Sequence, residues 1–217
     1  MLSPQIKEHL SRFYIGTKSR PKSWKKILFG IILSLFTISS ARAQDTKIVE
    51  RYAKNNRIRA KGQLFNGFPT GKWTYWHTNG RKAAEGEYKN GYRNSKWIHW
   101  HNNGKKKEEA TYIDGDIEGM WLNWHKNGQL KESMKFENYH ITGMYSGWHK
   151  NGKKDFEIEY KQLYKEDNKI EIINHGRWIY WYKNGQKKQK GIYNNGKLIG
   201  KWMYWDKKGN KLPDKTK

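Results

Sequence analysis

The sequence predicts an all-β fold, an elongated antiparallel up-and-down meander of repeated 24-residue β-hairpins. The main observation is a ten-residue block with two aromatic positions and a terminal Gly. The blocks start 24 residues apart, except for one step of 33, at Gly71, Ser95, Gly119, Gly143, Gly176 and Gly200. The second aromatic position is always Trp, at Trp76, Trp100, Trp124, Trp148, Trp181 and Trp205. Self-similarity at a fixed period indicates a repeat architecture.

The second observation is the spacing of the turns. Asn-Gly or Asp-Gly pairs alternate 11 and 13 residues apart and end at Gly80, Gly91, Gly104, Gly115 and Gly128. Both residues of such a pair accept the positive φ of a type I′ hairpin turn. The runs between them contain Trp, Tyr, Ile and Thr, which favour strands. Each repeat therefore has two strands. The array is predicted to fill residues 57–213, with an irregular repeat at 143–175 and a tail at 214–217.

Composition fits a thin fold without a deep core. Hydrophobic residues make up only 35% of the chain, whereas aromatic residues make up 15%, which argues against disorder. The chain has no Cys, which excludes disulfides and Cys-based zinc sites. The formal charge of +24 favours acidic partners such as phosphate-bearing polymers, anionic lipid or acidic protein. The alternative is that the Lys residues only solubilise the surface and protect the edge strands.

The N-terminal segment has the pattern of an export signal. Lys25 and Lys26 precede an apolar run, residues 27–38, and an Ala-x-Ala site ends at Ala43. This pattern predicts a signal peptide over residues 1–43, cleavage between Ala43 and Gln44, and a linker at 44–56. We therefore expect a bacterial protein exported to the periplasm, outer envelope or medium. An uncleaved membrane anchor is the alternative.

One segment resembles a known repeat family. The sequence EGEYKNG at 85–91, followed by Trp97, resembles the MORN repeat. The variant with two Trp residues is similar to bacterial proteins labelled as YwqK-family antitoxin components. The resemblance implies a twisted β-meander that binds proteins or lipids and has no active site. The chain has Ala84 where the family has Tyr, and its export signal conflicts with a cytosolic antitoxin.

Side-chain alternation along the strands places aromatic residues on both faces of the sheet. Because Tyr145 replaces Trp at the first aromatic position, we expect that row to be a surface and the second row, such as Trp124, to be packed. A one-residue bulge at Gly71, Gly119 or Gly200 would exchange the faces. The alternative is that both rows form the core. The candidate binding surface is Trp73, Tyr75, Trp97, Trp121, Tyr145, Trp178, Tyr180 and Trp202.

No residue pattern predicts catalysis, a metal site or a cofactor. His77, His101, His125 and His149 recur one repeat apart, roughly 10 Å at ~4.8 Å per strand, which is too far to share a zinc ion. The pair Glu85 and Glu87 lacks the cleft that a glycosidase needs. We therefore interpret these residues as part of the repeat scaffold and expect a protein that is not an enzyme.

The irregular repeat carries a second candidate site. It is nine residues longer than the others, which predicts a projecting hairpin. Insertions in repeat arrays often mark a binding face, although a neutral insertion is the alternative. The candidate contact loop is Tyr164, Lys165, Asp167 and Asn168.

These observations predict an exported, non-enzymatic scaffold for a protein or an acidic envelope component. Peripheral membrane association is compatible with the charge, and nucleic acid is disfavoured by export. The alternatives are a cell-wall or polysaccharide binding module that uses the aromatic rows, and an antitoxin component.

Overall fold

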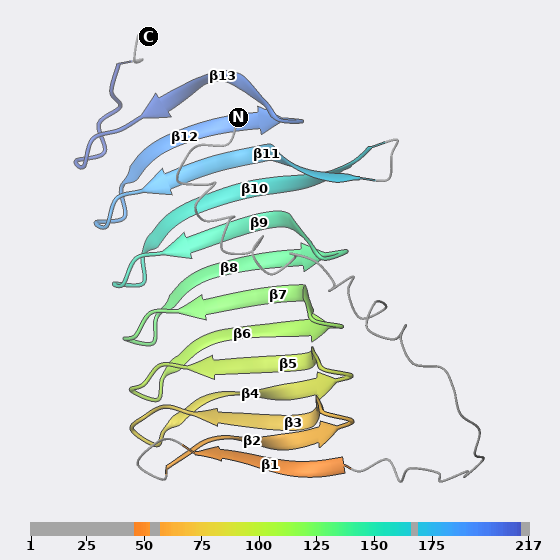
Figure 1. Cartoon of the computed structure of the whole chain (residues 1–217). Coiled ribbons are helices and arrows are strands. Elements are labelled where there is room, and N and C mark those ends of the chain that lie inside the picture. Colours follow the sequence, from red (N-terminus) through yellow and green to blue (C-terminus); the bar gives the residue numbers. More distant parts are fainter. Residues whose placement is uncertain (1–45, 53–56, 166–168, 214–217) are drawn as a thin grey trace, which may run out of the picture. The chain divides into compact units, whose positions relative to one another are not determined.

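The computed structural model describes residues 46–52, 57–165 and 169–213. These residues form one sheet of thirteen antiparallel strands, each hydrogen-bonded to its neighbours in the sequence (Figure 1). The strands are β1 (Thr46–Tyr52), β2 (Ile58–Phe65), β3 (Phe68–Trp76), β4 (Lys82–Lys89), β5 (Tyr92–Trp100), β6 (Lys106–Ile113), β7 (Asp116–Trp124), β8 (Leu130–Glu137), β9 (His140–Trp148), β10 (Lys154–Tyr164), β11 (Ile170–Trp181), β12 (Lys187–Asn194) and β13 (Lys197–Tyr204). The predicted all-β meander is confirmed.

Two predictions about the N-terminal part have different outcomes. The segment Thr46–Tyr52, which the sequence places in a linker, forms β1 and pairs along its length with β2. Its sequence TKIVERY contains the strand-favouring residues Thr, Ile, Val and Tyr, and the sheet begins one strand earlier than predicted. The signal peptide with Ala43 and Gln44 lies outside the described residues. The described part of the chain contains no helix that is long and apolar enough to cross a membrane.

The turns are of two kinds, and each kind lies along its own edge of the sheet (Figure 1). Two-residue turns such as Asn90-Gly91, with φ angles of 51° and 83°, follow the even-numbered strands β2, β4, β6, β8 and β12. The β10–β11 hairpin lies at the same edge, which we name the short-turn edge. Five-residue turns follow the odd-numbered strands β3 to β11 at the other edge, named the long-turn edge. The type I′ geometry expected of every Asn-Gly pair thus holds only at the short-turn edge, because only Gly80 has positive φ in the Asn79-Gly80 pair.

A bulge in the odd-numbered strands decides which residues of neighbouring strands lie opposite one another. Gly71, Gly119 and Gly200 have φ angles of 60°, 82° and 69°, and the strand register shifts beside them. In the next hairpin, Glu87 pairs with Asn94 but Glu85 pairs with Ile98, which leaves Trp97 opposite Gly86. Because Lys61 pairs with Thr74 and Gln63 pairs with Thr70, three residues of β3 (71–73) lie against one residue of β2 (62), so the bulge holds two extra residues. A shift of two keeps each side chain on its own face, so the exchange of faces expected of a one-residue bulge does not occur. The bulge instead aligns the first aromatic position of each repeat with a glycine or another residue of the core.

The core is a single row of side chains that crosses the strands. Trp73, Trp97, Trp121, Tyr145 and Trp178 are all buried, with 1–4% of their surface exposed. Glycine makes room for the indole rings: a Cβ atom on Gly62 would lie 2.1 Å from the ring of Trp73, and one on Gly86 would lie 2.2 Å from that of Trp97. These distances are far below van der Waals contact, so no larger residue fits there without moving the ring.

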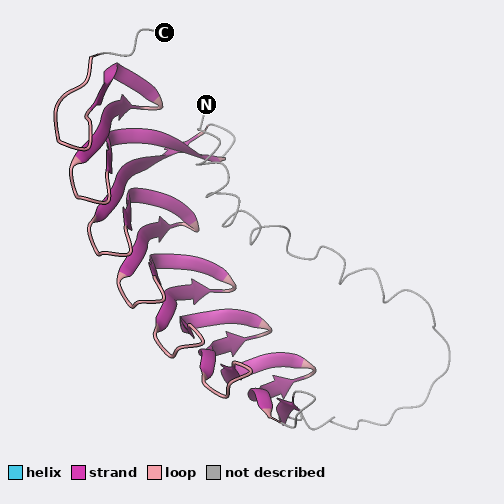
Figure 2. Ribbon diagram, turned by 90° about the vertical axis from the view of Figure 1, so that its left-hand side faces the viewer, coloured by secondary structure: helices cyan, strands magenta, loops and turns pink. Residues whose placement is uncertain are grey.

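The indole N–H groups are also satisfied inside this row. Trp97 Nε1 donates to the carbonyl of Glu87 at 2.9 Å, and Trp73 Nε1 donates to that of Gln63 at 3.1 Å. Tyr88 packs edge-on between the two rings, with centroids 5.9 Å from Trp73 and 4.9 Å from Trp97. Figure 2 shows how the hairpins that carry these residues follow one another along the array. Each repeat is thus stabilised mainly by the repeat beside it.

The opposite face of the sheet is charged. Glu85 bonds to Lys82 at 2.8 Å, and Glu109 pairs with both Lys96 and Lys106. Because exposed ion pairs contribute only about 0–1 kcal/mol each, this face adds solubility more than stability.

Candidate functional site

The predicted aromatic binding surface is not at the surface. Trp73, Trp97, Trp121, Tyr145 and Trp178 are buried, and Tyr75, Tyr180 and Trp202 are half-buried. The prediction is wrong because this row packs over the glycines of the even-numbered strands, with the ring of Trp73 over Gly62 and that of Trp97 over Gly86. Tyr145 replaces Trp within the core, where its hydroxyl donates to the buried Glu132 at 2.8 Å. Polysaccharide binding by an exposed aromatic stripe loses its basis.

The second Trp row was expected to be the packed one, and it is only half-buried. Lysine ammonium groups lie over several of these rings, at 5.2 Å for Lys82 over Trp100 and 4.9 Å for Lys106 over Trp124. The backbone carbonyl of Trp100 bonds to His77 Nε2 of the preceding repeat at 2.9 Å. These Trp residues therefore recur at the point where a strand ends and its long turn begins.

The recurrent histidines connect the repeats. Nε2 of His77, His101 and His125 lies 2.8–2.9 Å from a Trp carbonyl of the next repeat. Tyr182 occupies the same position and donates from its hydroxyl to Trp205 at 2.9 Å. A hydroxyl can replace imidazole here because one hydrogen bond is all that the position requires. Within the described ranges, no three His, Asp or Glu side chains group closely enough to hold a metal ion.

His99 and Glu108 form a polar pair on neighbouring strands. His99 Nδ1 is 3.5 Å from Glu108 Oε1. Burial, with Arg93 and Lys107 nearby, lowers the pKa of His99 to about 4. Burial also raises the pKa of the Glu108 carboxyl. Both shifts follow from desolvation, which disfavours charge, and they fit a packed polar pair.

The irregular repeat does form a longer hairpin. Strands β10 and β11 have 11 and 12 residues, whereas the strands on either side have 8 or 9. Tyr164 lies near the end of this hairpin with 63% of its surface exposed. Lys165 forms an ion pair with Glu171 at 2.9 Å. Asp167 and Asn168, the rest of the candidate contact loop, lie outside the described residues.

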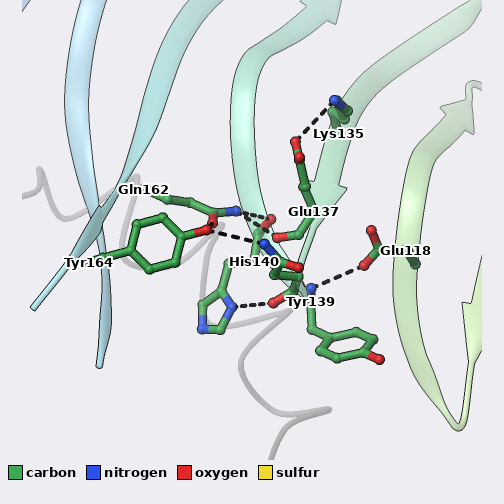
Figure 3. Close-up of polar contacts among 8 residues, drawn as sticks. Glu118, Lys135, Glu137, Tyr139, His140, Gln162 and Tyr164 are labelled. Atoms are coloured by element: carbon green, nitrogen blue, oxygen red, sulfur yellow. Dashed lines mark hydrogen bonds and ion pairs between the residues drawn. The ribbon is translucent and has the colours of Figure 1, made fainter. Parts of the chain in front are cut away.

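The long hairpin is fixed to the preceding short turn (Figure 3). Asn138 Nδ2 donates to the Tyr164 hydroxyl at 3.1 Å, and that hydroxyl donates to Gln162 Oε1 at 3.1 Å. Gln162 Nε2 in turn donates to the carbonyl of Glu137 at 2.6 Å. This chain of hydrogen bonds holds the exposed Tyr164 ring in place, so its position is set before any partner arrives.

Tyr139 is a functional candidate that the sequence prediction missed. It has a φ angle of 64° at a turn position that is Gly67, Gly91, Gly115 or Gly196 in other repeats. A bulky residue at positive φ is strained, by about 1–3 kcal/mol. Its N–H donates to Glu118 Oε2 at 3.1 Å, and 47% of its surface is exposed. The signal was present in the sequence, because Asn138-Tyr139 stands where Asn-Gly recurs.

Exposed aromatic residues thus gather along the short-turn edge. Phe68 lies over the next turn, 3.2 Å from the position of a Cβ on Gly91, and Tyr92 lies over Gly115 at the same distance. We name the four residues Phe68, Tyr92, Tyr139 and Tyr164 the aromatic edge. Each exposes 45–63% of its surface.

Comparison with known families agrees with the geometry. Four segments match the family model described as MORN repeat variant, at residues 69–90, 93–114, 117–138 and 174–195. These segments are similar to MORN-variant repeats. Each match begins in one odd-numbered strand and ends in or beside the short turn that follows the next even-numbered strand, so it spans the long turn. Residues 139–173, which include most of the irregular repeat, fall between the third and fourth matches. Among curated proteins, none matches the chain.

Proposed function

We propose that this MORN-variant repeat protein is an exported, non-enzymatic scaffold that holds a protein partner at its aromatic edge. The supporting observation is the distribution of aromatic side chains. The first aromatic position of the repeats is buried or half-buried, whereas the exposed aromatic residues gather at one edge, and two of them, Tyr139 and Tyr164, lie at or beside the irregular repeat. Tyr139 and Tyr164 depart from the repeat pattern, and both are at this edge.

Tyrosine is well suited to this role. Tyr and Trp are enriched among residues that dominate protein–protein binding energy, because they give a large contact area for few rotatable bonds. The hydrogen bonds from Asn138 and to Gln162 already orient Tyr164. A partner therefore loses less free energy to ordering this side chain than it would with a mobile one. The backbone strain at Tyr139 is the kind of local cost that accompanies functional positions.

The test is quantitative capture from envelope extract. We expect the wild-type chain to retain a specific partner, and the double variant Tyr139→Gly with Tyr164→Ala to lose most of it. Ile199→Ala is the matched control, because Ile199 is an exposed apolar residue, 55% exposed, in the last strand. Equal retention by all three proteins would contradict the proposal.

A further inference from the structure

The long-turn edge carries a second, chemically different surface. Lys126, Lys150, Lys183 and Lys207 occupy one equivalent position in four successive long turns, and all four are exposed. Arg81, Lys105 and Lys153 occupy the position after the turn glycine and are exposed as well. We name these seven residues the cationic strip.

Hydrogen bonds from asparagine side chains to the backbone of the next turn fix the spacing of the strip. Asn127 Nδ2 donates to the carbonyl of Lys150 at 2.6 Å, and Asn151 Nδ2 donates to that of Lys183 at 2.8 Å. Asn184 Nδ2 continues the series to the carbonyl of Lys207 at 2.7 Å. Successive turns are two strands apart, roughly 10 Å at ~4.8 Å per strand. The lysine backbones thus form a regular row. The ammonium groups of Lys105 and Lys153 donate to the carbonyls of Asn127 and Asn184 at 2.6 and 2.7 Å, which holds these two charges beside the next turn.

Little negative charge opposes this row. The five long turns 77–81, 101–105, 125–129, 149–153 and 182–186 contain no Asp or Glu. The last turn has Asp206, whose carboxylate accepts hydrogen bonds from the N–H groups of Lys208 and Asn210 at 2.8 and 2.9 Å. Since the Debye length is about 8–10 Å at 0.10–0.15 M salt, neighbouring lysines are not fully screened from one another. Their fields add up to a positive line along the edge.

The shape and polarity of the strip favour a line-like ligand. Peripheral membrane binding normally buries apolar side chains together with basic ones. None of the exposed large apolar residues in the described part of the chain lies in these six turns. The strip is also one turn wide and extends across the repeats, which suits an extended chain of charges better than a flat surface.

We propose that the cationic strip binds an extended polyanion with phosphate groups along its length, which lies across the long turns. This proposal does not depend on the aromatic edge, since the two surfaces lie on opposite edges of the sheet. Binding would be driven by counterion release, so it should weaken steeply as salt increases.

The test uses long-chain inorganic polyphosphate and the purified chain. The strip variant is Lys126→Gln, Lys150→Gln, Lys183→Gln and Lys207→Gln together. The control variant removes the same charge from exposed positions elsewhere, as Lys89→Gln, Lys161→Gln, Arg177→Gln and Lys197→Gln. Both variants should melt like the wild type, because the inter-turn bonds use backbone carbonyls of the strip lysines.

Between about 50 and 200 mM salt, we expect the strip variant to bind polyphosphate at least about tenfold more weakly than the wild type. Its slope of log affinity against log salt should fall by about 3, at ~0.7 for each phosphate no longer neutralised. The control variant should retain most of the affinity and slope. Equal loss in both variants would show an effect of net charge alone and overturn the proposal. Binding to phosphatidylglycerol vesicles without binding to polyphosphate would overturn it as well.

Discussion

Replacing Trp97 by Ala should destabilise the protein far more than replacing Trp100. Trp97 is 1% exposed, covers Gly86 and donates its indole N–H to Glu87. A buried Trp→Ala change costs about 3–5 kcal/mol. The unpaired carbonyl left behind adds to this cost, so we expect a value near the upper end, about 4–5 kcal/mol.

Trp100 is only half-buried. Its ring contact with Lys82, at 5.2 Å, contributes about 0.5–1 kcal/mol. Partial loss of apolar burial brings the expected cost to about 1–2 kcal/mol. The carbonyl that accepts from His77 is backbone and survives the change.

Urea denaturation followed by tryptophan fluorescence and far-UV circular dichroism measures both free energies of unfolding. The unfolding transitions measured by the two probes must coincide, because long repeat arrays can unfold in steps. A Trp100→Ala variant that loses as much stability as Trp97→Ala would refute the assignment of the core face.

Three further predictions follow from particular positions. Gly86→Ala should lower the free energy of unfolding about as much as Trp97→Ala, since its Cβ would lie 2.2 Å from the indole of Trp97. Gly191→Ala should be milder, because its Cβ would lie 2.8 Å from Trp202 near the end of the array. Thermal melts compare the two glycine variants, and equal losses of stability would contradict the packing argument. Tyr139→Gly should stabilise the protein by about 1 kcal/mol or more, because Gly relieves the strain at positive φ, and a lower melting temperature would show that Tyr139 is a packing residue. Intact mass of the protein from the envelope fraction should begin at Gln44, and a full-length chain recovered from the cytosol would contradict export.

The repeat pattern was sufficient to predict the fold but not the faces of the sheet. The 24-residue period, the two strands per repeat and the bulge at Gly71 follow from turn chemistry, which is local. The choice of core face depends on a non-local contact between Gly86 and Trp97, which the alternation of side chains within one strand does not reveal. Strict recurrence of Trp100 predicts packing, whereas in the structure Trp100 is half-buried and ends the strand before a long turn.

The candidate site was predicted in part. The nine-residue extension located the projecting hairpin and Tyr164, because an insertion in a regular array is visible in the sequence. The strained Tyr139 was missed, although the replacement of Asn-Gly by Asn138-Tyr139 was the available signal. Its importance depends on the exposed position beside Tyr164, which comes from the pairing of strands in different repeats.

The most direct test of the repeat account is a matched pair of internal deletions. Removing residues 95–118, one full period of 24, joins Asn94 to Gly119 and places Trp121 over Gly86 where Trp97 was. Removing only residues 95–117 leaves one extra residue, which turns the following side chains toward the other face. The account predicts that the first protein melts cooperatively with the circular dichroism of a shorter β-sheet, and that the second is markedly less stable. If both deletion proteins lost stability to the same extent, the account of an array of interchangeable hairpins would be contradicted.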